Sequence, residues 1–371
     1  MEPDPSTSRD VVRRLARWYG RAKRDLPWRR TRDPYAIWIS EVMLQQTTVE
    51  VVIPRWQRFL ARFPTVEALA RAQETTVLAE WSGLGYYGRA RNLHRAARAV
   101  ASVGSFPRTL EGWRGLPGVG AYTAAAITSI SFGVREPAVD GNVVRVLCRL
   151  HALPLDPKAP ATLAKVRALA RTLVPARNPG NHNQALMELG ALVCTPRAPR
   201  CRSCPLRGAC RAAASGKTER FPRRPLPAKP RSIHVVAGIV QRGKKILLVE
   251  DKTLVEGHLC VPMFEVGDGQ RPANVLKRGW EQVARRKPVA LEPVTTLRHS
   301  VLDRRYLVSL FTFEEKAPVP MLRRQLGASR RGPRVPPLPS RIRLLSPSQI
   351  SRHAHGGLLL KVLAAWRERG R

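Results

Sequence analysis

The spacing of apolar residues changes once along the chain, and the change divides it into two parts. Up to residue 213, apolar residues recur at every third or fourth position, which is typical of helices with one buried face. Gly and Pro interrupt the pattern, so several separate helices are predicted. The predicted helices cover residues 11–19, 37–60, 66–78, 90–103, 121–132, 143–150, 163–174 and 184–193.

Residues 212–232 contain four prolines, many cations and few apolar side chains, a composition typical of a stiff, extended linker. Beyond this stretch the pattern becomes strand-like. β-Branched and aromatic runs predict strands, and two amphipathic runs predict helices. The predicted strands cover residues 233–240, 245–250 and 306–313, and the predicted helices cover 275–286 and 357–367.

These patterns predict four regions. They are a disordered N-terminus over residues 1–8, a mostly α domain over 9–213, a linker over 214–231 and an α+β domain over 232–371. Within the last region, residues 323–343 are rich in Arg and Pro, which predicts a mobile loop.

The net charge of +38 and the isoelectric point of 11.5 favour a polyanionic partner, because cations bind phosphates and release their counterions. Both parts of the chain are basic, so the charge is not a tail. Solubility, or a general preference for arginine, is an alternative explanation for part of it. No long basic amphipathic helix is predicted, so nucleic acid is favoured over a membrane surface.

Two further segments bear on location. The first ten residues are acidic and polar, which argues against a signal or transit peptide. Residues 116–134 carry no charge but include Pro117 and three glycines. This composition predicts a loop followed by a buried helix, not a membrane span.

Four of the six cysteines lie close together with the spacing C-x6-C-x2-C-x5-C, which predicts one metal centre. Four thiolates suit zinc or an iron–sulfur cluster. Zinc ribbons favour two C-x2-C pairs, and here there is one, so zinc remains the less favoured alternative. Disulfides are disfavoured because nothing indicates secretion. The four are Cys194, Cys201, Cys204 and Cys210, while Cys148 and Cys260 are expected to be buried free thiols.

Residues 116–120 (LPGVG) precede the predicted helix 121–132 and follow an apolar segment. This order predicts a helix–hairpin–helix over residues 110–132. Gly118 and Gly120 let the backbone approach a phosphate closely, and the next helix directs N–H groups toward it. We therefore expect Gly118, Val119 and Gly120 to contact a DNA backbone, although any tight turn between helices has a similar sequence.

Two acidic residues have both a structural and a catalytic interpretation. Asp140, in the string VDGNV, is a favoured N-cap for the next helix, and it is equally a carboxylate that could lie near a reacting sugar. Ser40 could cap a helix with Glu41 in its first turn, near the positive end of the helix dipole. Neither residue by itself distinguishes the two interpretations.

The string SEVMLQQT at residues 40–47 resembles the signature of the MutY adenine glycosylases and not that of endonuclease III. The cysteine spacing is similar to the [4Fe–4S] loop of the endonuclease III and MutY family. Over residues 9–213 the resemblance is strong, and beyond them it is weak. Further strings match in order: RDLPWR at 24–29, GLGYY at 83–87, RARN at 89–92 and NQAL at 183–186.

The resemblance implies a helix–hairpin–helix glycosylase fold of two helical subdomains plus an iron–sulfur loop, followed by a Nudix-like domain. It implies hydrolysis of the N-glycosidic bond of an adenine flipped out of the duplex. Glu41, with a raised pKa, would protonate the base at N7. Asp140, ionised, would stabilise the oxocarbenium-like sugar. Asn142 and Tyr122 would position these groups and the attacking water.

Other site residues follow from the same resemblance. Core packing is the alternative explanation for Trp28 and Tyr86. Residues similar to the family's adenine pocket are Arg24, Leu26, Trp28, Arg29 and Gln184, and residues similar to the wedge that fills the vacated stack are Gln45, Gln46 and Tyr86.

Tyr122 also bears on strand cleavage. Bifunctional members of the superfamily carry a lysine two residues after the last hairpin glycine, and its amine forms a Schiff base with the sugar. The sequence has Tyr122 at this position. We therefore expect a monofunctional glycosylase with at most feeble lyase activity.

The C-terminal part departs from the family pattern. A Nudix hydrolase needs several clustered acidic residues to hold Mg²⁺, and residues 269–286 include only Glu281 at the expected place, so no nucleoside diphosphate hydrolysis is expected. Residues 257–262 (GHLCVP) also depart from the usual Gly-Leu-Trp-x-Phe-Pro pattern.

The expected lesion-recognition loop, His-x-Phe-Ser-His or His-x-x-Thr-His in the family, reads HSVLD at residues 299–303. His299 remains, but Leu302 replaces the hydroxyl residue and Asp303 replaces the last histidine. Discrimination of 8-oxoguanine from guanine is then expected to be weaker, or to pass to Ser300 or Arg304.

The expected partner is double-stranded DNA containing A:8-oxoguanine or A:G mispairs. The cluster is expected to have a structural or DNA-docking role, with Arg202 and Arg207 near phosphates. A cytoplasmic, nucleoid-associated monomer is expected. The alternatives are an endonuclease III-like or thymine-mismatch glycosylase, a DNA-binding protein without catalysis and a zinc-ribbon nucleic-acid binder.

Overall fold

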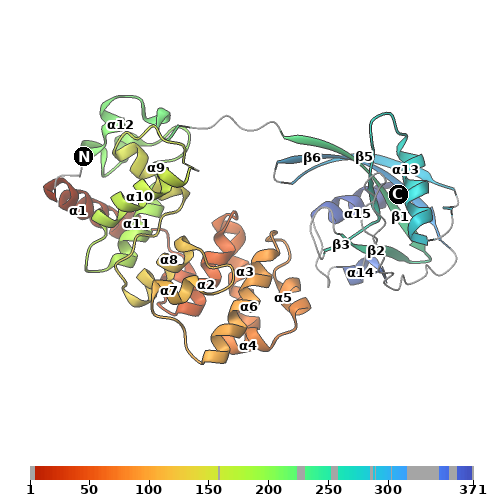
Figure 1. Cartoon of the computed structure of the whole chain (residues 1–371), viewed down its shortest axis with the longest axis horizontal. Coiled ribbons are helices and arrows are strands. Elements are labelled where there is room, and N and C mark those ends of the chain that lie inside the picture. Colours follow the sequence, from red (N-terminus) through yellow and green to blue (C-terminus); the bar gives the residue numbers. More distant parts are fainter. Residues whose placement is uncertain are drawn as a thin grey trace. The chain divides into compact units, whose positions relative to one another are not determined.

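The computed structural model describes residues 5–157, 159–223, 230–251, 258–284, 287–288, 290–301, 303–315, 342–350 and 357–369. The chain divides into two compact units. Unit 1 comprises Met1–Glu74 and Tyr86–Leu226, and unit 2 comprises Thr75–Gly85 and Pro227–Arg371. Figure 1 labels the elements of both units.

Unit 1 is helical, which confirms the mostly α class expected for the N-terminal part. Short 3-10 turns occur at η1 (Pro27–Arg29), η2 (Cys201–Ser203), η3 (Arg207–Ala209) and η4 (Thr218–Arg220). The helices before the hairpin are α1 (Pro5–Ala22), α2 (Pro34–Leu44), α3 (Val49–Arg62), α4 (Val66–Arg71), α5 (Glu74–Glu80, mostly in unit 2) and α6 (Gly88–Val103). The later ones are α7 (Leu110–Arg114), α8 (Ala121–Phe132), α9 (Gly141–Leu150), α10 (Pro160–Leu173), α11 (Pro179–Leu192) and α12 (Arg211–Ala214).

Two long helices expected from the sequence are each divided in the structure. The expected helix 37–60 becomes α2 and α3, because the chain turns at Gln46, whose φ is 58°. The expected helix 66–78 becomes α4 and α5, because Ala72 is extended with ψ 152°. Apolar spacing continues across both breaks, so the sequence pattern does not show them.

Both ends of the expected helical domain differ from the expectation. Helix α1 begins at Pro5, so the disorder expected for residues 1–8 does not extend to residues 5–8, and residues 1–4 lie outside the described residues. Part of the expected linker packs on α9. Arg149 Nε donates to the carbonyls of Thr218 and Phe221, at 3.1 and 2.9 Å. Residues 224–229 lie outside the described residues.

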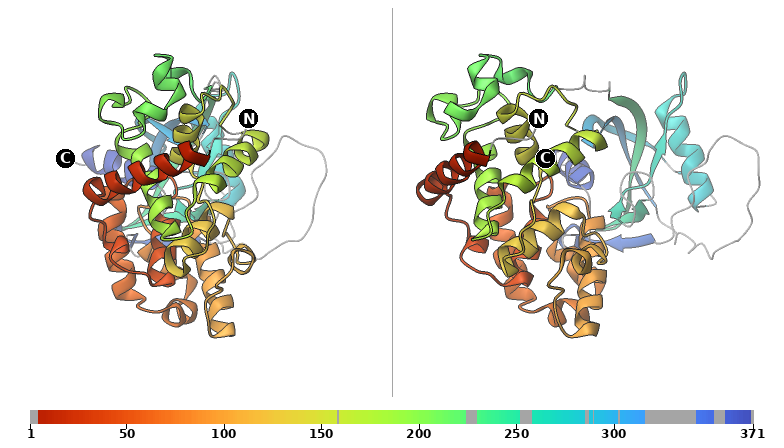
Figure 2. Two further views of the ribbon diagram at one scale, coloured as in Figure 1. Left: turned by 90° about the vertical axis from the view of Figure 1, so that its left-hand side faces the viewer. Right: turned by 60° about the vertical axis from the view of Figure 1, so that its left-hand side comes forward.

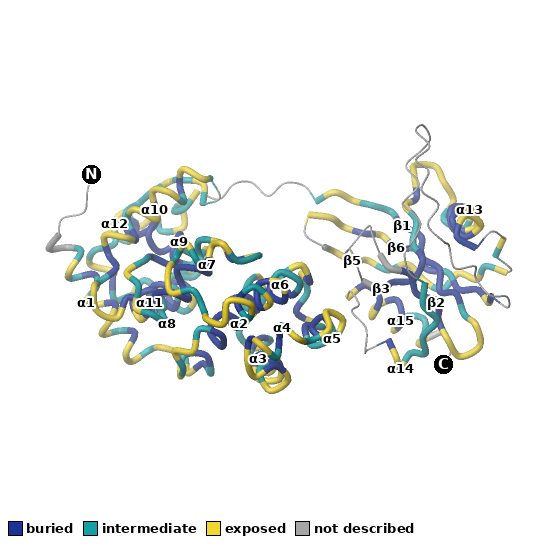
Figure 3. The backbone as a smooth tube through the Cα atoms, turned by 60° about the horizontal axis from the view of Figure 1, so that its bottom comes forward, coloured by how far each residue is buried: buried dark blue, intermediate teal, exposed yellow. Residues whose placement is uncertain are grey.

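Unit 1 has two groups of helices, as expected for two helical subdomains (Figures 1 and 3). One group forms around α1, α9, α10 and α11, whose apolar residues share a core that includes Leu15, Leu147 and Leu186. The other contains α2 and α8. Every residue of α2 from Tyr35 to Met43 is buried, and so is every residue of α8 from Thr123 to Ser129. Helices without a polar face are buried on all sides, so these two form the interior on which the site is built.

Unit 2 is an α+β domain, which confirms the class expected for the C-terminal part. The expected strands appear as β1 (Arg231–Arg242), β2 (Lys245–Asp251) and β6 (Arg304–Glu314). The short or polar strands were not predicted: β3 (His258–Cys260), β4 (Met263–Glu265), β5 (Glu292–Val301) and β7 (Ile342–Leu345). The remaining helices are α13 (Pro272–Ala284), α14 (Pro347–Ile350) and α15 (Gly357–Arg369).

The sheet of unit 2 is mixed and lies between helices. Its order is β3-β2-β1-β6-β5, with β4 also paired to β1 and β7 to β2. The β1–β6 pair is parallel, and the other pairs are antiparallel. Helix α13 covers one face through Leu276 and Trp280, and α15 covers the other through Leu359 and Val362 (Figure 2).

The remaining expectations concern a mobile loop, two free cysteines and the absence of a membrane span. The mobile loop expected over residues 323–343 lies outside the described residues except for Ile342 and Arg343 in β7. Cys148 and Cys260 are buried free thiols, as expected. No helix in the described part of the chain is long and apolar enough to cross a membrane.

Candidate active site

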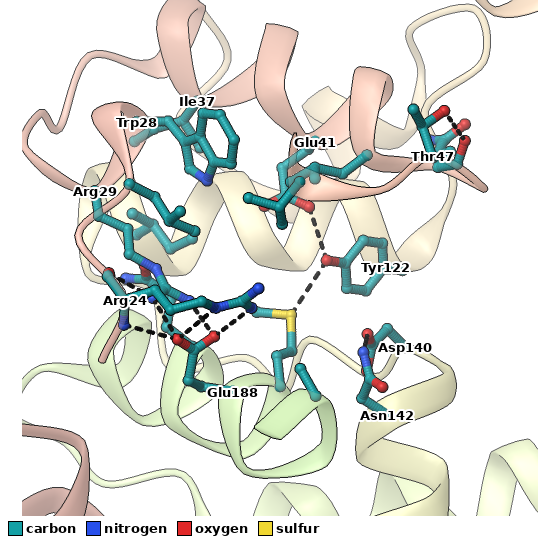
Figure 4. A pocket seen from close by; sticks show the side chains of 18 of the residues that line it. Arg24, Trp28, Arg29, Ile37, Glu41, Thr47, Tyr122, Asp140, Asn142 and Glu188 are labelled. Carbon is teal, nitrogen blue, oxygen red and sulfur yellow. Dashed lines mark hydrogen bonds and ion pairs between the residues drawn. The ribbon is translucent and has the colours of Figure 1, made fainter. Parts of the chain in front are cut away.

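A pocket of about 650 Å³ lies in unit 1 and gathers residues that are far apart in the sequence. Its walls come from η1, α2, α8, α9 and α11 and from the turn after α2 (Figure 4). Expected site residues that line it are Arg24, Leu26, Trp28, Arg29, Glu41, Gln45, Gln46, Tyr122, Asp140, Asn142 and Gln184.

Glu41 lies in the middle of α2, not at its start. Asp33 caps this helix by accepting hydrogen bonds from the N–H groups of Tyr35 (3.0 Å) and Ala36 (3.1 Å). The expectation that Ser40 caps the helix is therefore wrong, and Ser40 Oγ instead donates to the carbonyl of Ile37 at 2.7 Å. The helix dipole acts mainly within the first turn, so it does not set the charge of Glu41.

Burial sets that charge instead. Glu41 is 7% exposed, and desolvation raises the pKa of its carboxyl to about 7. The Tyr122 hydroxyl donates to Glu41 Oε2 at 2.7 Å and moderates the rise in pKa. The charge of Asp140 raises this pKa further, and the charge of Arg29 lowers it. Burial also raises the pKa of Tyr122, so its hydroxyl keeps its proton and remains a donor.

Asp140 is the N-cap of α9, as its sequence context predicts. Its Oδ1 accepts from the N–H of Val143 at 2.7 Å, and its Oδ2 accepts from the side-chain amide of Asn142 at 2.8 Å. Burial raises the pKa of Asp140 above its ordinary value, although these donors limit the rise. The N–H donors and the positive end of the α9 dipole favour the anion. When one proton is shared between Glu41 and Asp140, Glu41 therefore holds it.

The side chain of Asn142 is held in place by Arg145. Its Oδ1 accepts from Arg145 Nη2 at 2.7 Å, and the same guanidinium donates to the carbonyls of Cys194 and Gly190 at 2.7 and 2.8 Å. A Cβ on Gly190 would lie 2.5 Å from the Asn142 Cβ, so only glycine lets α11 approach α9 this closely. Arg145 and Gly190 were not singled out in the sequence, because their role depends on the contact between these two helices.

Glu188 is a second buried carboxylate of the pocket and was missed by sequence reasoning. Its side chain is 1% exposed and forms ion pairs with Arg24 (2.7 Å) and Arg29 (2.9 Å). The backbone N–H of Arg24 also donates to it at 2.8 Å. Burial raises the pKa of Glu188, but these donors outweigh it and hold the pKa at about 2. Its position one helical turn after Gln184 on α11 was the available signal.

Other expected residues lie outside the pocket lining. Gly118 is exposed at the hairpin with φ 75°, and a Cβ there would lie 2.6 Å from the Asn92 Cβ. Val119 is buried, and Gly120 precedes α8 as its N-cap residue. Tyr86 is 44% exposed and has φ 48°. Core packing therefore does not explain Tyr86, whereas Trp28 is buried.

The four clustered cysteines lie near one another beside α9. Arg149 Nη1 donates to Cys194 Sγ at 3.3 Å, and Cys210 Sγ donates to the Arg149 carbonyl at 3.5 Å. Burial raises the pKa of Cys204 to about 11, and charge on the other three sulfurs raises it too, so the four thiols share one neighbourhood. Nevertheless, no group of three or more His, Cys, Asp or Glu side chains in the described part of the chain is placed to hold a metal ion.

The recognition residues expected in the C-terminal part belong to unit 2. His299 is half-buried on β5, where burial and the charge of Lys361 lower its pKa. Ser300 and Asp303 are exposed, and Leu302 lies outside the described residues, as does Gly257.

Comparisons with known proteins place this arrangement in a family. The family model described as "HhH-GPD superfamily base excision DNA repair protein" matches residues 39–172. A solved thermostable thymine-DNA glycosylase is 30% identical, with a TM-score of 0.53, over 57% of this chain and 98% of that one. The helical part of this chain therefore shares the fold of that glycosylase. The chain belongs to the HhH-GPD superfamily of base excision DNA repair proteins.

Curated relatives confirm the resemblance to MutY-type proteins. The human adenine DNA glycosylase is 48% identical over 209 residues, which are 53% of this chain and 38% of that protein. That of Buchnera aphidicola subsp. Acyrthosiphon pisum is 38% identical over 208 residues, 55% of this chain and 59% of the relative. The chain thus spans less than two thirds of these relatives. An endonuclease III–DNA complex, at 24% identity and a TM-score of 0.50, shares the fold.

Proposed function

We propose that the protein is a monofunctional DNA glycosylase that removes adenine mispaired with 8-oxoguanine or guanine in double-stranded DNA. The observation that carries this proposal is the pairing of Glu41 and Asp140 across one pocket. One buried carboxyl has a pKa of about 7, and both oxygens of the other accept hydrogen bonds, which favours its ionised form. Two carboxyl groups with different charges can serve as acid and as cation stabiliser in glycoside hydrolysis.

Glu41 is the proposed general acid. Adenine is a poor leaving group as an anion, so protonation at N7 allows it to leave neutral. A pKa of about 7 keeps a large fraction of Glu41 protonated near neutral pH, which suits an acid working at that pH. The Tyr122 hydroxyl, which donates to Glu41 Oε2, fixes the orientation of the carboxyl group.

Asp140 is the proposed stabiliser of the sugar cation that forms as the bond breaks. Its two oxygens are held by Val143 N–H and the Asn142 amide, so it is fixed before the charge develops. Such preorganised groups stabilise a transition state without reorganisation. Asn142 and Tyr122 position these groups and the attacking water.

The remaining walls suit a flipped purine. Leu26 and Trp28 supply apolar surface, while Arg24, Arg29 and Gln184 supply hydrogen-bond donors. An extrahelical base is read by its polar edge and held by apolar or aromatic faces. Gln45, Gln46 and Tyr86 are the proposed wedge, and Gly118, Val119 and Gly120 are the proposed contacts to the phosphate backbone.

The four clustered cysteines are the proposed ligands of a [4Fe–4S] cluster, which would fix this loop and present Arg202 and Arg207 to DNA. The donor set fits, because four thiols share one neighbourhood. A cluster is larger than a single ion, because each cysteine binds a different iron. The single C-x2-C pair disfavours a zinc ribbon, which favours two such pairs.

Unit 2 is the proposed reader of the opposite base, in the manner of a degenerate Nudix-like domain. His299 is the proposed recognition residue. Discrimination of 8-oxoguanine from guanine is expected to be weak or to rest on Ser300 and Arg304. The protein is expected to be a cytoplasmic, nucleoid-associated monomer.

The test is single-turnover excision from duplexes with adenine opposite 8-oxoguanine, guanine, cytosine or thymine. Release of adenine only opposite 8-oxoguanine or guanine supports the proposal. A duplex with thymine opposite guanine tests the second candidate, a thymine-mismatch glycosylase, which the structural likeness to a thymine-DNA glycosylase favours. Release of thymine and not adenine would replace the proposal, and binding without release from any duplex would favour a non-catalytic protein.

A further inference from the structure

One guanidinium outside the pocket lining joins the C-terminal end of α2 to a segment about forty residues later in the sequence. Arg89 lies near the start of α6, and its Nη1 donates to the carbonyls of Val42 at 2.8 Å and Met43 at 3.2 Å. The same nitrogen donates to the carbonyl of Gln45. These carbonyls belong to the C-terminal end of α2, where helical carbonyls lack helical partners and a cation is favourable.

The same guanidinium also holds the second segment. Its carbon lies 5.5 Å from the centre of the Tyr86 ring, which is a cation–π contact. The backbone N–H of Arg89 also donates to the Tyr86 carbonyl, at 2.8 Å. Arg89 therefore binds the end of α2 through its donors and Tyr86 through its planar face. Lysine cannot satisfy both contacts in this geometry, because its charge is a point and not a plane.

Both segments have an unusual backbone. Gln46 has φ 58° and Tyr86 has φ 48°, and neither is glycine. Residues other than glycine rarely adopt this left-handed backbone conformation. Such a conformation persists only when the surrounding structure holds it in place. Gln46 is exposed and Tyr86 is 44% exposed. The structure thus maintains two strained, exposed residues without burying either of them.

We propose that Arg89 is a positioning residue that makes these segments one rigid wedge, so that Gln46 and Tyr86 enter the base stack together. This inference rests on the proposed glycosylase function. It concerns the step before chemistry, in which a paired adenine leaves the duplex. The requirement for Arg89 should therefore depend on whether the adenine must be separated from a partner base.

The experiment compares two substrates with Arg89→Gln and Arg89→Lys. One duplex carries adenine opposite 8-oxoguanine, and the other carries adenine opposite an abasic site, where no partner base has to be separated. We expect single-turnover excision from the paired duplex to fall about 10- to 100-fold for both variants, because small misplacements cost this much. Excision opposite the abasic site should fall far less.

Arg98→Gln is the matched control. Arg98 lies on the same helix, and its Nε donates to the carbonyl of Ala70 at the end of α4 at 3.3 Å. The substitution Arg98→Gln thus removes the same charge and the same kind of contact as Arg89→Gln, but at a place away from the wedge. We expect it to behave as the unmodified protein on both duplexes. Fluorescence of 2-aminopurine in place of adenine should show slower base flipping in the Arg89 variants alone.

Three results would overturn the inference. They are equal losses on the two duplexes, unchanged excision in both Arg89 variants, or an equal loss in Arg98→Gln. Arg89→Lys keeps the charge and serves if Arg89→Gln does not fold. If Arg89 acts through the wedge, adding Arg89→Gln to Tyr86→Ala should cost little beyond Tyr86→Ala alone. An unmodified protein that releases no adenine would contradict the proposed function itself, whereas an active protein indifferent to Arg89 would contradict only this inference.

Discussion

Two buried carboxyl groups line the same pocket, and their pKa values are shifted in opposite directions. Glu41 is 7% exposed and has its pKa raised to about 7, whereas the side chain of Glu188 is 1% exposed and has its pKa held at about 2. Both groups are buried, and the one with less exposed surface is the ionised one. Burial alone therefore does not decide the charge. Glu188 accepts from two guanidinium groups and a backbone N–H, whereas Glu41 accepts from one tyrosine hydroxyl.

The two groups also differ in how their neighbourhood is built. Arg24 and Arg29 lie in the segment around η1, and both guanidinium groups reach Glu188 across to α11. Glu41 lies in the buried part of α2 and accepts from Tyr122, which lies just before the buried part of α8. The ionised carboxylate links two walls of the pocket, whereas Glu41 keeps a large protonated fraction near neutral pH.

The largest effect is expected from removing the acid. Glu41→Gln keeps the size and shape of the side chain but has no proton of suitable acidity. We expect the single-turnover excision rate to fall by about 10²- to 10⁴-fold. DNA affinity, measured by fluorescence anisotropy, should be retained. A variant that still excises adenine at the original rate would contradict the role of Glu41.

Removing the ionised partner should affect stability first. Glu188→Gln leaves two partly exposed cations without their buried anion, and we expect the free energy of unfolding to fall by about 3 kcal/mol, the lower end of the range for a broken buried pair, measured by urea denaturation. The control is Glu136→Gln, since Glu136 pairs with Arg171 at the surface at 2.9 Å and should contribute about 0–1 kcal/mol. Equal losses in the two variants would contradict the distinction between buried and surface pairs.

The same pair predicts an acid transition. The pKa of Glu188 is lowered from its ordinary value of 4.5 to about 2. Its stabilisation is therefore complete above about pH 4.5 and is lost as the pH falls toward 2. Thermal melting followed by circular dichroism should show a steeper loss of Tm over this range in the unmodified protein than in Glu188→Gln. Identical slopes would contradict this assignment.

A smaller effect is expected at Tyr122. Tyr122→Phe removes the hydrogen bond that lowers the pKa of Glu41, so the pKa of Glu41 should rise and the rate should persist to higher pH. Tyr122→Lys is the companion variant. It introduces the amine that bifunctional enzymes use, and borohydride should trap it on DNA. Strong trapping of the unmodified protein would contradict monofunctional chemistry.

Prediction from the sequence was most complete where short strings hold the chemistry. Several residues of SEVMLQQT and RDLPWR line one pocket together with Asp140 and Gln184, because neighbouring residues in a short string keep a fixed local geometry. Glu188, Arg145 and Gly190 were missed, because each acts on a partner from another helix. The helix breaks at Gln46 and Ala72 were not predicted, because a change of φ or ψ at one residue does not alter the spacing of apolar residues. The short strands β3, β4 and β7 offer too few residues for an alternating pattern.

The proposed chemistry depends on the proton held by Glu41, so the most direct measurement is the pH dependence of single-turnover adenine excision opposite 8-oxoguanine. The pKa of Glu41 is raised to about 7, so its acidic form is lost as the pH rises through that value. We predict a rate that is highest below about pH 7 and then falls about tenfold per pH unit. A rate that stays constant from pH 6 to about pH 9, or that rises over this range, would contradict the assignment of Glu41 as the general acid.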